Sequence, residues 1–178
     1  MESDTEEKLN NETEGFKTKL LEERNISFKV ALIAITAALY IALGYLFQPI
    51  SFLGLQFRVA ELIVGMCIIF PLEGLTGKVI GVFFVNLTSP LGPIDLISCI
   101  VNVPALYCII LLREKKFLKY LGGVLYAIII SIYVTIVLTI AFPQSIWWLN
   151  FVQVLTAEII LATLGILLFD IIRSRINI

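Results

Sequence analysis

The sequence predicts an all-α integral membrane protein, a six-helix bundle that crosses the bilayer about six times with both chain ends in the cytoplasm. Of its 178 residues, 59% are hydrophobic and only 15% are charged. Soluble domains are about 45–50% apolar, so this excess indicates lipid as the solvent, as does the mean hydropathy of +0.97. Two further observations support the prediction: a series of apolar segments, and a one-sided distribution of Lys and Arg.

Two regions are expected along the chain. Residues 1–24 are predicted to be a disordered acidic cytoplasmic tail, because they hold eight of the fourteen acidic residues and have little apolar surface to bury. Residues 25–178 are predicted to form the transmembrane substrate-binding domain. We expect no secretory signal, since the first apolar run begins only near Phe28 and has no small-residue cleavage site.

The apolar segments supply the helices. A helix needs about 20 apolar residues to cross a hydrocarbon core of roughly 30 Å. The second and third segments are short by this rule, so together they could instead form one re-entrant hairpin. Turns are expected at 71–77, where the third segment starts, and at 89–93, before the fourth. The six expected segments are 28–47, about 57–70, 75–87, 94–112, 117–142 and 146–172.

The basic residues then lie on one side of the bundle. Short cytoplasmic loops carry an excess of Lys and Arg, and the opposite loops at 48–56, 88–93 and 141–146 contain neither. Trp147 and Trp148 begin the last segment at its outer end, where aromatic rings favour the membrane interface. The residues assigned to the cytoplasmic side are Arg24, Lys29, Lys78, Arg113, Lys115, Lys116, Lys119, Arg173 and Arg175.

Ionisable side chains at membrane depth are the first functional candidates, because they are costly there and generally face the bundle interior. Arg58, Glu61, Asp95 and Glu158 are all expected in the outer half. Arg58 and Glu61 would share one helical face, and the simplest alternative is that Arg58 pairs with Glu61 or Asp95 and only locks the bundle. Glu158 has no basic neighbour in the sequence. Its donor could be Arg58, an asparagine or a ligand N–H.

Two asparagines complete the candidate site. Asn86 lies near the outer end of its segment, and Asn102 lies two turns below Asp95 on the same face. Interhelical hydrogen bonding explains these asparagines at least as well as ligand contact does. The predicted substrate-binding residues, which form a polar pocket facing outside, are Arg58, Glu61, Asn86, Asp95, Asn102 and Glu158.

Other classes of function are disfavoured. Histidine is absent, and Cys67, Cys99 and Cys108 lie in apolar runs, so we read them as small buried hydrophobes and expect neither a metal nor a cofactor. No nucleophile–base pair occurs, so the chain is not expected to be an enzyme. The net charge of −1 argues against a nucleic-acid partner. Nothing in the chain could hydrolyse ATP, so a transporter this small needs ion coupling or an external motor.

A stripe of small residues marks one face of the first segment. Small residues let helices approach closely in lipid. Packing inside the bundle and docking to another subunit both remain open, and the same holds for Gly77 and Gly81. The stripe consists of Ala31, Ala34, Ala38 and Ala42, of which the last three are the predicted docking residues.

Three stretches resemble the queuosine-precursor transporter family, whose members are substrate-binding (S) components of energy-coupling factor transporters. They are LQFRVAEL at 55–62, IGVFFVN at 80–86 followed by LGPID at 91–95, and the Glu158 helix with Trp147 upstream and Gly165 downstream. The resemblance covers about residues 28–175. The chain departs from the family pattern at 97–104 and at Ala157, where the family has glycine before the glutamate.

The resemblance implies an S-component-like fold in the cell membrane, with both termini cytoplasmic. It implies capture of a 7-deazaguanine base, such as 7-aminomethyl-7-deazaguanine or its nitrile, from outside. Uptake would be driven by two ATPase subunits through a transmembrane coupling subunit, on which the alanine stripe would dock. The alternatives are an S component for another vitamin-like solute, a stand-alone ion-coupled carrier, and a membrane scaffold without transport activity.

The chemistry of such a ligand suggests roles for the candidate residues. A guanine-like edge presents N1–H and an exocyclic amine, and a buried carboxylate can accept both hydrogen bonds. Glu158 is expected in that role. Glu61 or Asp95 would meet an aminomethyl cation, and Asn86 would satisfy a carbonyl or ring nitrogen.

Overall fold

The computed structural model describes residues 25–52 and 57–176, and every regular element in these ranges is a helix. The acidic tail expected at 1–24 lies outside the described residues. Four helices are long and apolar enough to cross a membrane, with mean hydropathies of 2.1 to 2.6. They agree with the expected segments at 28–47, 94–112, 117–142 and 146–172 to within a few residues. These helices span Asn25–Leu46, Pro93–Leu112, Leu118–Ala141 and Trp147–Arg175.

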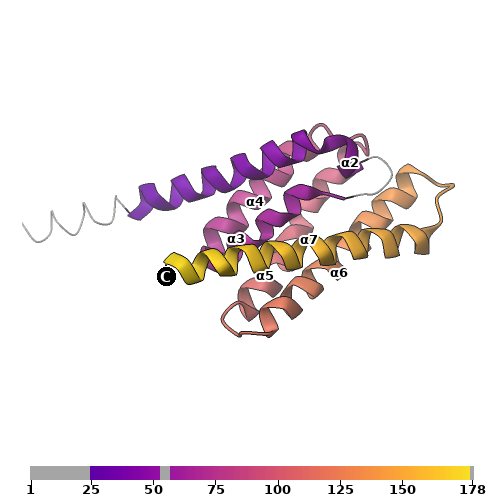
Figure 1. Cartoon of the computed structure of the whole chain (residues 1–178). Coiled ribbons are helices and arrows are strands. Elements are labelled where there is room, and N and C mark those ends of the chain that lie inside the picture. The colour runs from indigo at the N-terminus through magenta and orange to yellow at the C-terminus, as the bar shows by residue number, and fades with distance from the viewer. Residues whose placement is uncertain (1–24, 53–56, 177–178) are drawn as a thin grey trace, which may run out of the picture.

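The element order places short helices between the long ones. The N-terminal helix (Asn25–Leu46) is followed by α2 (Gln48–Phe52), the 3-10 helix η1 (Val59–Gly65), α3 (Met66–Ile69) and α4 (Pro71–Asn86). The second half contains the 3-10 helix η2 (Pro93–Ile97), α5 (Ser98–Leu112), α6 (Leu118–Ala141) and α7 (Trp147–Ile176). The N-terminal helix and the C-terminal end of α7 begin and finish at the same end of the molecule (Figure 1).

The region at 57–87 corrects two expectations. The segment predicted as one helix is a 3-10 helix followed by a single turn of α-helix, and the turn expected at 71–77 is absent. Instead, α4 begins at Pro71, because proline at the first helical position has a favourable φ and needs no N–H partner there. Gly74 and Gly77 therefore lie inside α4.

Within residues 57–87, η1 and α3 run from one end of the bundle to the other, and α4 returns in the opposite direction. The ring of Phe70, at the end of α3, contacts that of Phe28 near the chain's first described residues, with centroids 6.1 Å apart. At the opposite end, the Tyr45 hydroxyl donates a hydrogen bond to the carbonyl of Phe84 in α4, at 3.1 Å. The N-terminal helix and α4 thus run side by side in the same direction. Six crossings with cytoplasmic termini remain a prediction, since both short segments fall below the length of a full span.

Glycines bring the N-terminal helix and α4 into close contact. A Cβ on Gly77 would lie 2.6 Å from the carbonyl oxygen of Ile33, and one on Gly81 would lie 2.7 Å from the Cβ of Tyr40. The Gly77/Gly81 pair therefore packs inside the bundle. The alanine stripe of the N-terminal helix lies on another face and is exposed at all four positions, Ala31, Ala34, Ala38 and Ala42.

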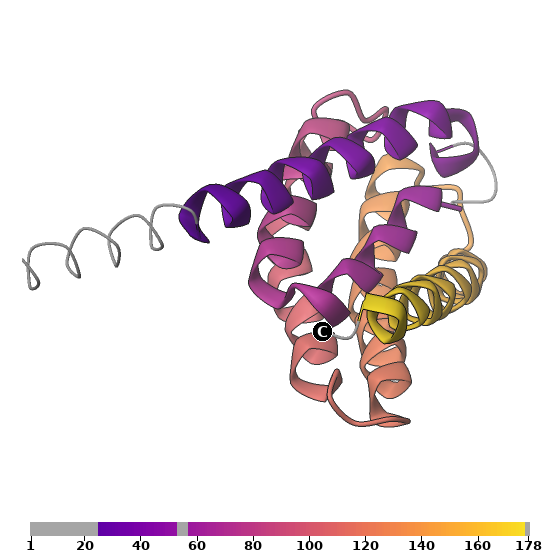
Figure 2. The ribbon, with the colours of Figure 1, turned by 60° about the vertical axis from the view of Figure 1, so that its left-hand side comes forward.

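The η1–α3 segment lies between α4 and α7, and it crosses α7 at two glycines (Figure 2). A Cβ on Gly65 would be 2.1 Å from the carbonyl oxygen of Gly165, and one on Gly165 would be 2.4 Å from that of Leu62. The two backbones touch at this crossing, which fixes where η1 lies against α7. Cys67 next to it is buried as expected, whereas Cys99 and Cys108 are only half-buried.

Candidate functional site

Polar side chains inside the bundle form two layers. The Lys78 layer consists of Tyr40, Glu61, Lys78, Asn102 and Tyr126, and the Asp95 layer consists of Arg58, Asn86, Asp95 and Ser98. Every one of these side chains is buried. Both layers draw on helices that are distant in the sequence. The fold brings five of the six predicted site residues into these two groups, and Glu158 belongs to neither.

Lys78 is at the centre of its layer and is fully enclosed, with 0% of the residue exposed. Its Nζ lies 2.8 Å from Glu61 Oε2 and donates to Asn102 Oδ1 at 2.7 Å and to the Tyr126 hydroxyl. An ammonium has three N–H donors, and these three partners use all of them. The Tyr40 hydroxyl donates to Glu61 Oε1 at 2.7 Å, and that of Tyr126 donates to Oε2. The Lys78 layer is therefore internally satisfied.

This position of Lys78 is a correction. The sequence placed it in a cytoplasmic turn, whereas the earlier start of α4 moves it two turns into the helix and turns it toward Glu61. Lys119, also expected in a loop, lies in the first turn of α6, buried, with its Nζ 2.5 Å from Asp170 Oδ2. Lys78 thus gives no information on which side of the membrane the loops lie.

The Asp95 layer is built on η2. Gly92, with φ of 83°, occupies a left-handed conformation that glycine adopts without strain, and the chain then enters η2 through Pro93. Asp95 is turned inward, where its Oδ2 lies 3.3 Å from Arg58 Nη2. The Asn86 amide donates to the Asp95 carbonyl at 3.0 Å and to Ser98 Oγ at 2.6 Å.

Arg58 therefore pairs with Asp95 and not with Glu61. The expectation that Arg58 and Glu61 share a helical face is corrected, because Arg58 precedes η1 with a non-helical ψ of 87°. The chain bends there, so Arg58 joins the Asp95 layer and Glu61 joins the Lys78 layer. The sequence left two partners open for Arg58 in a purely structural role, Glu61 and Asp95, and the structure shows the pair with Asp95.

Four buried side-chain oxygens of the described residues have no hydrogen-bond partner: Asp95 Oδ1, Ser131 Oγ, Thr135 Oγ1 and Glu158 Oε2. A buried polar atom without a partner costs about 1–3 kcal/mol, so the two carboxylate oxygens mark where donors are required and the two hydroxyls where a donor or an acceptor is required. Glu158 is only 1% exposed and lies on α7, which packs against η1, the helix that carries Glu61.

Ser131 and Thr135 lie close to the level of Glu158. They stand one turn apart on α6, which packs closely against both α5 and α7. Ser131 is ten residues before the end of α6 at Ala141, and Glu158 is eleven residues after the start of α7 at Trp147. Both are therefore at a similar distance from the α6–α7 turn. The unpartnered groups at this level are the Glu158 carboxylate and the two hydroxyls, while Asp95 Oδ1 belongs to the Asp95 layer.

A cavity of about 440 Å³ adjoins Glu158 on the other face of α7. Its walls are mostly apolar, and none of the six predicted site residues lines it. An apolar wall alone cannot orient a polar base, so we place the candidate site at the buried oxygens, with the cavity as adjoining space. Its lining residues are Phe57, Leu149, Val152, Gln153, Thr156, Ala157 and Ile160.

Sequence reasoning missed several members of the two layers. Lys78 was recoverable from Pro71, which begins its helix, and Tyr40 from its place on the face of the N-terminal helix away from the alanines. Tyr126 and the buried hydroxyls of Ser131 and Thr135 lie on α6, and single hydroxyls in a long apolar segment give only a weak signal.

Comparison with known proteins identifies a family. The family model described as QueT transporter matches residues 30–174 of the chain. No curated protein and no solved structure matches it. The matched residues include both polar layers, the unpartnered oxygens and the glycine crossing.

Proposed function

The chain belongs to the QueT transporter family, and we propose that it captures a 7-deazaguanine precursor of queuosine from outside the cell. Membership confirms the family that the sequence motifs predicted, and with the four long apolar helices it makes the chain a multi-pass membrane protein. In our proposal, the chain is the S component of an energy-coupling factor transporter in the cell membrane. Uptake then requires a separate transmembrane coupling subunit and two ATPase subunits.

The observation that carries the ligand proposal is the buried Glu158 carboxylate, whose Oε2 has no hydrogen-bond donor among the described residues. A guanine-like edge supplies two parallel donors, N1–H and the exocyclic amine, which match a carboxylate. Asp95 Oδ1 offers a second acceptor, and the hydroxyls of Ser131 and Thr135 can donate or accept. Arg58 and Asn86 act in this proposal by holding Asp95 in place.

Replacing Glu158 by Gln should weaken binding of 7-aminomethyl-7-deazaguanine by about 100-fold. Hydrogen bonds to a charged group are worth about 1.5–3 kcal/mol, and every 1.4 kcal/mol is roughly tenfold in affinity. Isothermal titration of the detergent-purified chain measures this. The matched control is Glu73→Gln, which neutralises a half-buried carboxylate in the first turn of α4 and should bind like the wild type. A folded Glu158→Gln variant with unchanged affinity would place the ligand elsewhere.

The summed charge of the two polar layers and Glu158 leads to a second prediction. Arg58 and Lys78 contribute two positive charges and Glu61 and Asp95 two negative ones, so the region sums to −1 when Glu158 is also ionised. A monocation neutralises this sum, whereas a neutral ligand leaves it. The aminomethyl compound should therefore bind at least about tenfold more tightly than the nitrile, because one close charge contact is worth more than 1.4 kcal/mol in a poorly screened interior. Equal affinities in the same titration would show that charge plays no part in recognition.

An S component for another vitamin-like solute is the second candidate. It is favoured by Ala157, which replaces the family glycine and lies on the wall of the 440 Å³ cavity, where its methyl group changes the available space. Mass spectrometry of the ligand that co-purifies with the chain distinguishes the two. A 7-deazaguanine supports the first proposal, and an unrelated heterocycle supports the second.

Docking on the coupling subunit is proposed for the alanine face of the N-terminal helix. Ala34, Ala38 and Ala42 are exposed there, while Thr36 and Tyr40 of the same helix are buried against the bundle. The face is thus available to a partner helix, and its small side chains permit close approach.

A further inference from the structure

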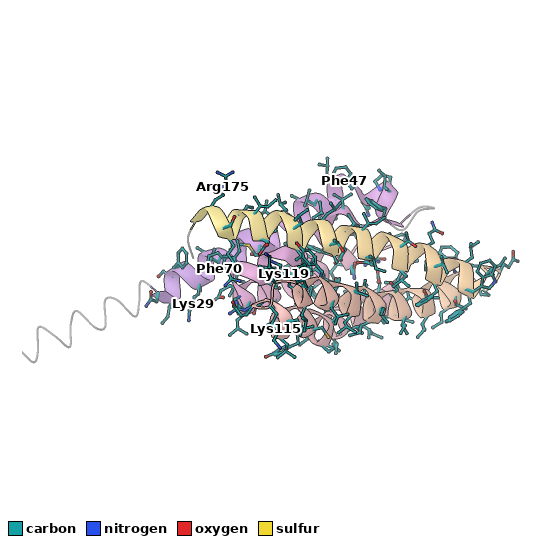
Figure 3. The ribbon with its side chains drawn as sticks, turned by 60° about the horizontal axis from the view of Figure 1, so that its bottom comes forward. Lys29, Phe47, Phe70, Lys115, Lys119 and Arg175 are labelled. Carbon is teal, nitrogen blue, oxygen red and sulfur yellow. The ribbon has the colours of Figure 1, made fainter. Side chains whose placement is uncertain are left out.

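A second cavity, of about 400 Å³, lies at the opposite end of α5 from the Asp95 layer. It is formed by the connection between α5 and α6 together with the C-terminal part of α7. Figure 3 shows Lys29, Lys115, Lys119 and Arg175 toward this end of the molecule. We call it the basic groove, and its lining residues are Arg113, Glu114, Lys116, Lys119, Asp170, Arg173 and Ser174.

The lining of the basic groove carries a surplus of positive charge. It contains four basic and two acidic side chains, which gives a formal sum of +2. The acids hold the bases in place: Glu114 Oε1 lies 3.1 Å from Arg113 Nε, and Glu114 Oε2 lies 3.0 Å from Arg173 Nη2. The hydrogen bond from Arg173 lowers the pKa of the Glu114 carboxyl, so this residue stays ionised at neutral pH and keeps both arginines at the groove. The result is a group of positioned donors with uncompensated charge.

Apolar residues flank the basic groove. Phe117, between α5 and α6, is 75% exposed, and Ile171 on α7, next to the groove residue Asp170, is 51% exposed. Leu168 on the same helix is also exposed. A molecule with a phosphate in the groove and hydrocarbon beside it would cover both kinds of surface at once. A free phosphate would contact only the basic groove and leave the apolar residues uncovered.

We propose that the basic groove binds the phosphate of an anionic phospholipid, whose acyl chains lie against the exposed residues Phe117, Leu168 and Ile171. Arginine and lysine are the usual ligands of phosphate oxygens, and basic pockets between membrane helices on the cytoplasmic side suit anionic headgroups. This site is separate from the proposed substrate site and does not depend on it. It anchors the α5–α6 connection to the end of α7 through the lipid.

Native mass spectrometry of the full chain with added lipid tests the proposal. The chain should retain one phosphatidylglycerol molecule at concentrations that leave phosphatidylcholine of the same acyl chains unbound. Lys116→Gln and Arg173→Gln should each weaken phosphatidylglycerol retention at least about fivefold, the loss expected for one basic residue near a charged headgroup. Lys116 makes no ion pair within the described part of the chain, so its substitution should leave the fold unchanged.

Two neighbouring substitutions are the matched controls. Lys115→Gln and Arg175→Gln remove exposed charges at the same end of the molecule but outside the groove lining, and both should retain the lipid like the wild type. Equal losses in all four variants would mean attraction by net charge alone and would overturn the site. Equal retention of phosphatidylcholine would overturn anionic selectivity. Glycerol 3-phosphate at about 10 mM would largely occupy a site that binds it with a millimolar dissociation constant. If it displaces the lipid completely, a soluble phosphate and not a lipid is the ligand.

Discussion

Replacing Lys78 by Met should destabilise the folded chain by about 3–5 kcal/mol, the loss expected when one partner of a buried ion pair is removed. Lys78 is fully enclosed and lies 2.8 Å from Glu61, so the substitution leaves a carboxylate inside the bundle without its counter-ion. It also removes a donor from Asn102 and Tyr126. The thermal midpoint in detergent, followed by tryptophan fluorescence, should fall by on the order of 10 °C.

Two variants make this result specific. Lys78→Met combined with Glu61→Gln removes both charges and should recover most of the lost stability, because no uncompensated charge remains. Lys119→Met is the matched control, since Lys119 pairs with an Asp170 side chain that is 34% exposed and whose charge water can still solvate. A Lys78→Met variant as stable as the wild type would show that the Lys78 layer does not hold the bundle together.

Replacing Gly165 by Ala should be nearly as damaging, with an expected loss of about 3 kcal/mol, at the upper end for overpacked interiors. The new Cβ would lie 2.4 Å from the carbonyl oxygen of Leu62, and a backbone atom cannot move aside as the end of a side chain can. The two helices must separate instead. Because η1 carries Glu61 and follows Arg58, separation would also displace both layers and weaken ligand binding.

Gly123→Ala is the matched control for this crossing. Its Cβ would lie 2.7 Å from Ile166 Cδ1, which is the flexible end of a side chain, so the expected loss is about 1 kcal/mol. The Gly165→Ala variant should therefore have both a lower thermal midpoint and a weaker ligand affinity than the Gly123→Ala variant. Equal midpoints would indicate that η1 and α7 can move apart without cost.

The sequence alone determined the long helices, the membrane class and the family. These depend on length, apolarity and short motifs, which are properties of continuous segments and can be read without knowing what each segment packs against. The α6 helix shows this, since its predicted bounds of 117–142 differ by one residue at each end from Leu118–Ala141. The sequence also makes Asp95 and Glu158 candidate site residues, because an acid in an apolar segment is conspicuous whichever way its side chain points.

Only the tertiary structure decided how the polar residues pair. Arg58 and Glu61 are three residues apart, yet a non-helical turn at Arg58 sends them to different layers. The sequence predicts Lys78 in a loop, and its actual place opposite Glu61 depends on where α4 begins and on glycine contacts with the N-terminal helix. The partners of a buried charge come from other helices, and which helices meet is set by backbone contacts such as Gly65 with Gly165. Hydropathy describes each helix separately, so it carries no information on these contacts.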